Sequence, residues 1–80
     1  MSTEEPYDRF IPPGTRVRYA PENGRIEYGV VVHCWFDDEI QMYDCYTAFF
    51  GTSQVVGKPD EAPYVLRYAA VSLDVIEPEV

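Results

Sequence analysis

The sequence predicts a single, small, all-β domain. Its 80 residues are enough for one domain with a thin core, because a chain of this length buries only about 60% of the surface of its unfolded form. Short apolar stretches with a two-residue period recur along it, separated by clusters of Gly, Pro, Asn and Asp. No segment has the periodicity of an amphipathic helix, so we expect strands to supply the core.

The first part of the chain divides into a leader and the start of the domain. Residues 1–13 are polar and contain prolines, which predicts a flexible leader. The domain itself is expected over residues 14–80. Its first strand is expected at Thr15–Ala20, where Val17 and Tyr19 alternate with arginines, so that one face of the strand is exposed to water.

A tight hairpin is predicted to follow this strand. Asn23-Gly24 is the strongest short hairpin signal, because both residues tolerate the positive φ angles of a two-residue turn. With these residues at the turn, apolar residues face one another and the ends of the hairpin carry opposite charges. The resulting pairs are Glu22 with Arg25, Tyr19 with Tyr28, and Val17 with Val30.

The strongest strand signal is at residues 28–36, whose two faces are both largely apolar, as is typical of a central, bent strand. The acidic residues 37–39 predict the next turn, and a third strand is expected over residues 40–50. That third stretch does not alternate cleanly, so we expect a bulge or a bend near Asp44. The even-numbered residues of the central strand are predicted to form one continuous apolar face: Tyr28, Val30, Val32, Cys34 and Phe36.

The last third of the chain predicts two shorter strands. Residues 51–63 contain two glycines and two prolines, which predicts a loop. Tyr64–Tyr68 predicts a fourth strand, Ala69–Ser72 a single helical turn, and Leu73–Glu77 a short final strand.

This succession of elements resembles the SH3-like barrels, which include the Tudor and KOW-type domains. The similarity covers about Gly14 to Glu77, and it implies a small five-stranded barrel with one short helical turn before the last strand. KOW-type domains are generally basic and contact nucleic acid, and this acidic chain departs from them. The residues that carry the resemblance are Pro13-Gly14, Gly29–Val32, Tyr43–Cys45 and Ala70–Ile76.

The resemblance to Tudor domains implies a candidate binding surface. Tudor domains hold methylated Lys or Arg in an aromatic cage beside an acid, and a cation over an indole ring contributes about 0.5–2 kcal/mol. The chain departs from the usual Tudor pattern after the third strand, where it has Phe49-Phe50-Gly51. The candidate binding residues are Trp35, Phe36, Asp37, Asp38, Tyr43 and Tyr46. In the alternative interpretation, Trp35 packs in the core against Phe10, Tyr7 or the C-terminal segment.

The charge distribution limits the classes of partner. Fourteen acidic residues against six basic ones give a net charge of −8, all of it carried by residues 26–80. Binding to nucleic acid depends on a basic surface that releases counterions, so direct nucleic-acid binding is not expected, nor docking on an anionic membrane. A basic protein partner is expected instead. A net charge of this size also serves solubility alone.

The ionisable and nucleophilic residues do not predict an enzyme. His33 and Cys34 are neighbours in a strand and should point to opposite faces, so they cannot act as a dyad. If Asp37-Asp38 form a two-residue turn, Cys34 lies opposite Gln41, which leaves Cys45 too far away for a disulfide. A register shifted by two residues brings the two cysteines only to a diagonal, so we expect both thiols to be free. With one His and two Cys no metal site or cofactor is expected. The polar N-terminus and the absence of long apolar runs favour a cytoplasmic protein.

Three functional hypotheses remain from the sequence. The first is a non-enzymatic interaction module that binds a cationic protein segment through its aromatic and acidic surface. The second is an acidic inhibitor, of the kind found among immunity proteins, which blocks an enzyme or a nucleic-acid-binding protein by charge complementarity. The third is a self-associating assembly subunit, with Val31 and the edge strands forming the contact between copies.

Overall fold

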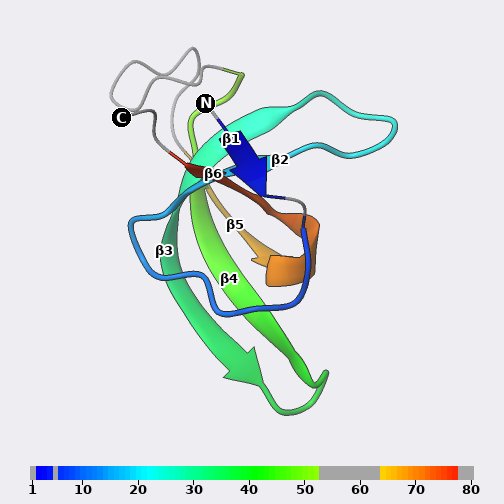
Figure 1. Cartoon of the computed structure of the whole chain (residues 1–80), viewed down its shortest axis with the longest axis vertical. Coiled ribbons are helices and arrows are strands. Elements are labelled where there is room, and N and C mark those ends of the chain that lie inside the picture. Colours follow the sequence, from blue (N-terminus) through cyan, green and yellow to red (C-terminus); the bar gives the residue numbers. More distant parts are fainter. Residues whose placement is uncertain (1, 5, 53–63, 78–80) are drawn as a thin grey trace.

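The computed structural model describes residues 2–4, 6–52 and 64–77, and these form one bent antiparallel sheet (Figure 1). The order of the strands across the sheet is β1-β6-β2-β3-β4-β5. One 3₁₀ turn, η1, precedes the last strand. The elements are β1 (Ser2–Glu4), β2 (Arg16–Tyr19), β3 (Glu27–Asp37), β4 (Met42–Phe49), β5 (Tyr64–Ala69), η1 (Ala70–Ser72) and β6 (Asp74–Glu77).

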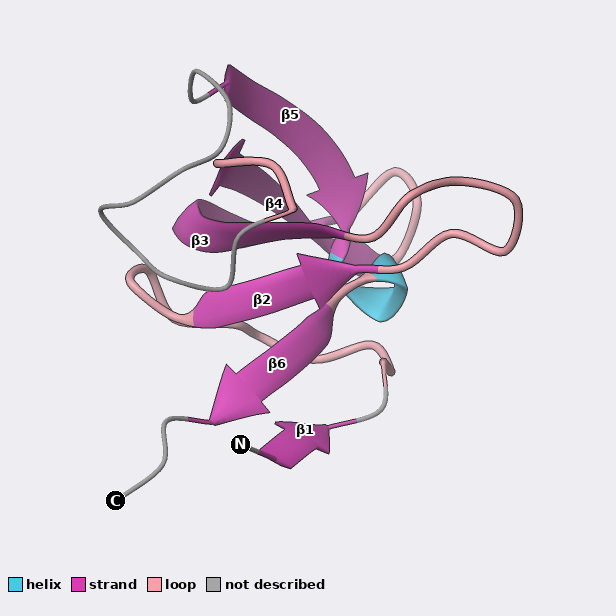
Figure 2. Cartoon of the chain, turned by 90° about the horizontal axis from the view of Figure 1, so that it is seen from above, coloured by secondary structure: helices cyan, strands magenta, loops and turns pink. Residues whose placement is uncertain are grey.

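The predicted all-β class is confirmed, together with the short helical turn before the final strand. The sheet curls, so that β3, β4 and β5 lie on one side of the interior and β2, β6 and β1 on the other (Figure 2). In the described residues the two end strands, β1 and β5, do not pair with each other. The sheet is therefore open, and the predicted closure into a barrel is not seen. Most of the predicted 51–63 loop lies outside the described residues.

The predicted register of the first hairpin is wrong by one residue. Arg18 pairs with Tyr28 and Val17 with Gly29, in place of the predicted Tyr19–Tyr28 and Val17–Val30 pairs. Residues 20–26 connect the strands as a longer loop, and neither Asn23 nor Gly24 has the positive φ that a two-residue turn requires. The observed register places Gly29 between Val17 and Phe49, where the backbones approach closely.

The irregularity in the sheet lies in β3 and not near Asp44. Val31 pairs with Thr47 and His33 with Tyr46, so Val32 is an extra residue that forms a bulge. In contrast, β4 pairs with β5 without interruption. The bulge reverses the side-chain alternation of β3. Before it the odd-numbered side chains point towards the core, and after it the even-numbered side chains do. The predicted continuous even-numbered face is therefore wrong: Gly29, Val31 and Cys34 are buried, whereas Val32 and Phe36 are about half exposed.

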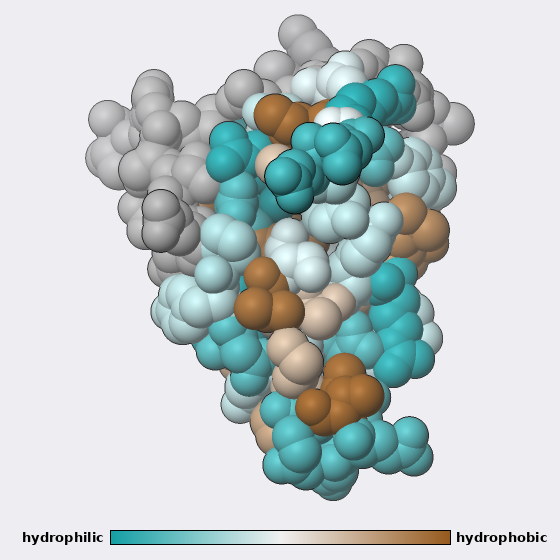
Figure 3. All heavy atoms as spheres, turned by 90° about the vertical axis from the view of Figure 1, so that its right-hand side faces the viewer, coloured by the Kyte–Doolittle hydropathy of each residue, from teal (hydrophilic) through white to brown (hydrophobic). Residues whose placement is uncertain are grey.

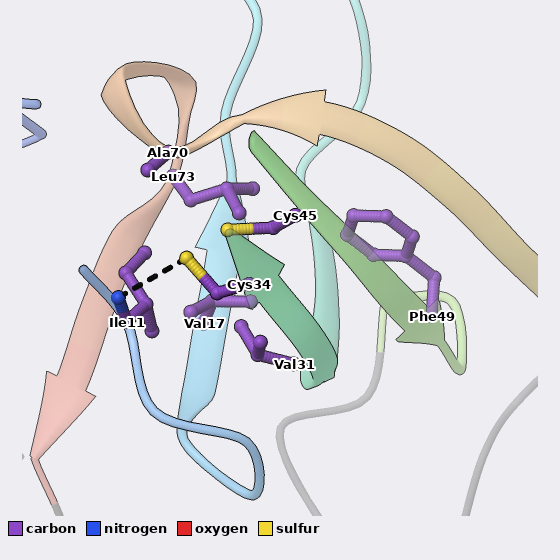
Figure 4. Close-up of a cluster of buried hydrophobic side chains, with 8 residues drawn as sticks. All are labelled: Ile11, Val17, Val31, Cys34, Cys45, Phe49, Ala70 and Leu73. Atoms are coloured by element: carbon purple, nitrogen blue, oxygen red, sulfur yellow. Dashed lines mark hydrogen bonds between the residues drawn. The ribbon is translucent and has the colours of Figure 1, made fainter. Parts of the chain in front are cut away.

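The core fills the inside of the bend (Figure 4). Phe49 is its largest fully buried side chain, and it contacts the rings of Tyr64 and Tyr68. Val31 is 1% exposed, so it cannot form the surface of a dimer contact as the third functional hypothesis supposed. The buried cluster consists of Ile11, Val17, Val31, Cys34, Cys45, Phe49, Ala70 and Leu73.

The N-terminal segment contacts the domain at several places. Ser2–Glu4 pairs with β6, and Ile11 is 1% exposed within the core. The Arg9 guanidinium donates to the carbonyl oxygens of Ala70 (2.7 Å), the first residue of η1, and of Leu73 (2.9 Å), which follows η1. Residues 6–12 therefore run along the fold and reach the end of the β3–β4 hairpin, where the candidate binding residues lie.

Candidate functional site

The six candidate binding residues lie on or beside the β3–β4 hairpin, but on both of its faces. Trp35 and Asp37 share the outer face of the sheet with Tyr46, because the cross-strand pairs His33–Tyr46 and Trp35–Asp44 point their side chains the same way. Phe36 pairs with Tyr43, and both point to the opposite face, which we call the core face. Asp38 lies in the turn between the strands. The structure therefore divides the predicted surface into two clusters.

Aromatic rings cover the outer face of the hairpin. The Trp35 ring stacks on His33, with centroids 5.5 Å apart and planes at 19°. It also contacts Tyr46, with centroids 5.2 Å apart. Trp35 is partly buried on this face, so the alternative in which it packs in the core against Phe10 or Tyr7 is wrong.

A cation of the protein itself already lies against this ring. The guanidinium carbon of Arg67, on β5, is 5.3 Å from the centroid of the Trp35 ring. Its Nε donates to Asp44 Oδ2 (2.5 Å) and its Nη2 to Asp37 Oδ2 (3.2 Å). The hydrogen bond to the Asp44 carboxylate raises the pKa of Arg67 above its ordinary value. The outer face is thus a filled cation site, with Arg67 in the position where the sequence predicts a foreign cation.

Asp37 connects this site to the turn of the hairpin. While its Oδ2 accepts from Arg67, its Oδ1 accepts from the backbone N–H of Glu39 (2.9 Å). The turn also holds Gln41 at a φ of 56°, with its side-chain amide donating to the carbonyl oxygen of Asp38 (2.6 Å). These bonds leave Asp38 and Glu39 exposed at the tip of the hairpin.

The core-face cluster is formed by three rings at the open end of the sheet. Tyr43 contacts Phe36 edge-on at a centroid distance of 5.2 Å, and Phe10 at 6.1 Å. Phe10 remains 49% exposed and Phe36 44% exposed. Asp8 fixes the N-terminal segment here, because its Oδ1 accepts from the backbone N–H of Tyr43 (2.9 Å). We call Phe10, Phe36 and Tyr43 the ring cluster.

The ring cluster belongs to a wider apolar strip. Figure 3 shows brown and beige spheres running down this side of the molecule to the hairpin end, where teal spheres surround them. Ile40, in the turn, is 49% exposed and adds to the apolar surface at this end. A hollow of about 260 Å³ lies beside Phe10, between the N-terminal segment and β6. Its lining includes Tyr7, Phe10, Ile11 and Val75.

The nucleophilic residues are separated as the sequence predicts, although by a different register. His33 is exposed on the outer face and Cys34 is buried in the core, so the expected separation of the two is confirmed. Cys34 faces Cys45 directly and not Gln41, so that part of the prediction is wrong. Both thiols are free, as predicted, and both sulfur atoms point into the core (Figure 4). Burial, and then the neighbouring Cys34 thiol, raise the pKa of Cys45 to about 12.

We expect the free energy of unfolding to fall as the pH rises from about 9 towards 12. Burial and the hydrogen bond to Glu27 raise the pKa of Tyr64 to about 12 as well. Unfolding returns Cys45 and Tyr64 to ordinary values of 9.0 and 10.0, so the unfolded chain loses these protons first and alkali favours it. Urea titrations between pH 7 and 11 measure this slope.

The matched variants for this measurement are Cys45→Ala and Tyr64→Phe, each of which removes one proton from the linkage. In both variants the free energy of unfolding should fall less steeply with pH than in the wild type. The slope should differ by at most about 1.4 kcal/mol per pH unit, the value for one proton. A slope that is the same in Cys45→Ala, Tyr64→Phe and wild type would contradict the assignment.

Sequence reasoning missed three contributors to these clusters. Phe10 falls within the predicted flexible leader, and the sequence pattern does not mark Asp44 as the partner of a cation. Arg67 carried a signal, because it is one of only two basic residues after residue 25. A lone arginine in a strand beside an acid-rich hairpin is a candidate for an ion pair, although only the register of β4 and β5 identifies Asp44 as its partner.

Comparison of the chain with protein-family models, with curated proteins and with solved structures found no match. Within residues 2–4, 6–52 and 64–77, no three His, Cys, Asp or Glu side chains gather closely enough to hold a metal ion. Nor does the described part of the chain contain a helix of the length and apolarity that crossing a membrane requires. Inference about function therefore rests on the two clusters of the hairpin.

Proposed function

We propose that this protein is a non-enzymatic interaction module, which binds a cationic segment of a protein partner at the end of the β3–β4 hairpin. The observation that supports the proposal is the ring cluster, in which two half-exposed rings, Phe10 and Phe36, rest on Tyr43 beside exposed acidic residues. Rings held in this way have little conformational freedom to lose on binding, and burying them removes apolar surface from water.

Charge determines the chemistry of the partner. Asp8, Asp38 and Glu39 are exposed around the ring cluster. Arg9, which follows Asp8 in the chain, directs its guanidinium to the carbonyl oxygens beside η1. A segment with an apolar anchor flanked by Lys or Arg therefore complements the surface, with the anchor against Phe10 and Phe36. A second copy of this chain does not, since it would bring like charges together.

An SH3-like architecture is part of the same proposal. The order β6-β2-β3-β4-β5 and the 3₁₀ turn immediately before the last strand are the features that support it. Small domains built from a bent antiparallel sheet commonly use their own exposed aromatic residues to bind peptides. We therefore place the peptide along the apolar strip of Figure 3, with the hollow beside Phe10 accepting one of its apolar side chains.

The proposal is tested with synthetic 12-residue peptides that combine Leu or Phe with Lys or Arg, using acidic peptides of equal apolar content as controls. We expect saturable binding of the basic peptides alone, followed by calorimetry or by amide chemical shifts. Phe36→Ala should weaken this binding by about tenfold or more, the usual result of truncating a central aromatic anchor. Val65→Ala is the matched control, because it removes an apolar side chain that is still more exposed (57% against 44% for Phe36) from the outer face of β5.

A folded Phe36→Ala variant that binds the peptides as well as the wild type would refute the ring-cluster site. The acidic inhibitor is the competing function, and it responds differently. In that case Asp38→Asn/Glu39→Gln and added salt should lower the association rate gradually, while Phe36→Ala should have little effect.

A further inference from the structure

The outer face of the hairpin carries a second site, which goes beyond the proposed function. Asp44 and Asp37 lie on β4 and β3, and their side chains are 6% and 16% exposed. Arg67 reaches them from β5 with a side chain that is 51% exposed. The two carboxylates are therefore largely buried, whereas the guanidinium of Arg67 is the more exposed partner.

The geometry of the site matches a guanidinium group more closely than an ammonium group. Two different nitrogens of one planar group bond to two different carboxylates, while its carbon lies 5.3 Å from the centre of the Trp35 ring. An ammonium group is a compact point charge, which lacks the planar fork that presents two separate nitrogens to two carboxylates. The Trp35 ring is itself supported by His33 and Tyr46, so its position does not depend on Arg67 alone.

We infer that Trp35, Asp37 and Asp44 form a binding site for an arginine side chain of a partner, and that Arg67 is its internal occupant. A partner's arginine and Arg67 compete for the same two carboxylates. Binding is weakened by the fraction of time that Arg67 fills the site: if it does so about nine-tenths of the time, the apparent affinity falls about tenfold. Removing Arg67 should restore that affinity.

The test uses ethylguanidinium as the probe, with ethylammonium as its control at constant ionic strength. Because the chain has one tryptophan, the indole N–H signal of Trp35 reports on the site alone in a nuclear magnetic resonance titration. In Arg67→Ala we expect the shift of this signal to saturate with a Kd of about 10 mM, an affinity that so small a ligand can reach. The wild type should need about ten times more probe, and ethylammonium should bind less well than ethylguanidinium.

A second substitution shows whether the carboxylate is responsible. Arg67→Ala/Asp44→Asn should lose the saturable shift. The inference is overturned if Arg67→Ala, with a dispersed amide spectrum, shows no saturable shift, or if the double variant shifts as much as the single one.

If Arg67→Ala does not fold, Arg67→Lys decides the question, since it retains a charge but not the two-nitrogen contact. It should bind ethylguanidinium more tightly than the wild type does, and equal affinity would overturn the inference. Because the ring cluster lies on the opposite face, the peptide experiment with Phe36→Ala can fail or succeed independently.

Discussion

Gly29→Ala is expected to destabilise the fold by more than about 3 kcal/mol, a large part of the 5–15 kcal/mol typical of a small domain. A Cβ atom at residue 29 would lie 2.6 Å from the carbonyl oxygen of Ala48 and 2.9 Å from Cγ2 of Thr47. The oxygen belongs to the backbone of the neighbouring strand, so no side-chain rotation relieves the contact. Urea unfolding followed by circular dichroism measures the loss.

The matched control is Gly14→Ala, since an added Cβ there meets nothing within 4 Å. Gly14 has a φ of 90°, so its substitution strains the backbone and should cost about 1 kcal/mol. The two variants therefore test different causes: steric overlap at Gly29, which does not have a positive φ, and backbone strain at Gly14. If both variants lose the same stability, the close approach of β3 and β4 does not explain the need for Gly29.

Deletion of Val32 is expected to remove the bulge and to leave the fold intact. The bulge at this residue sets opposite parity for the two halves of β3, so that both Val31 and Cys34 point into the core. Without the extra residue, Val31, His33 and Cys34 follow one another opposite β4, and regular alternation keeps Val31 and Cys34 on the core face and His33 on the outer face. We expect a spectrum with the amide dispersion of a sheet, and a loss of stability of no more than about 3 kcal/mol.

The side chain of Val32 itself should be dispensable, because it is 52% exposed. Val32→Thr keeps the extra residue and the branched shape, and its unfolding midpoint should match the wild type within about 0.5 kcal/mol of stability. A deletion variant that fails to fold, while Val32→Thr is as stable as the wild type, would show that β3 needs more from the bulge than the parity of its two halves, contrary to the role assigned here.

The elements could be predicted from the sequence because alternation and turn residues are local signals. Every predicted strand of the domain appears within a few residues of its expected place. Register could not be predicted in the same way. Asn23-Gly24 favours a two-residue turn locally, but Gly29 fits beside Val17 and Phe49 only in the observed register. That register is also fixed by the pair of Arg18 with Asp74 on β6, 56 residues away.

The candidate site was predicted in composition but not in arrangement. A run of rings and acids from Trp35 to Tyr46 marks the hairpin correctly as a surface, because such residues seldom fill a core without partners. Which rings share a face depends on the parity of β3, which the bulge sets beyond the reach of a simple alternation rule. That Arg67 fills the Trp35 site depends on the pairing of β5, which no local pattern specifies.

The position of Arg67 also bears on the solubility of the protein. Among the described strands β5 has a neighbour on one side only, and Val65 and Leu66 are exposed along it. An apolar edge strand is a template for intermolecular pairing, and a charged side chain within it is a common natural protection against aggregation. Arg67 places its charge directly after these two residues. Its role at the edge of the sheet would persist even when a partner's arginine had displaced it from Asp44.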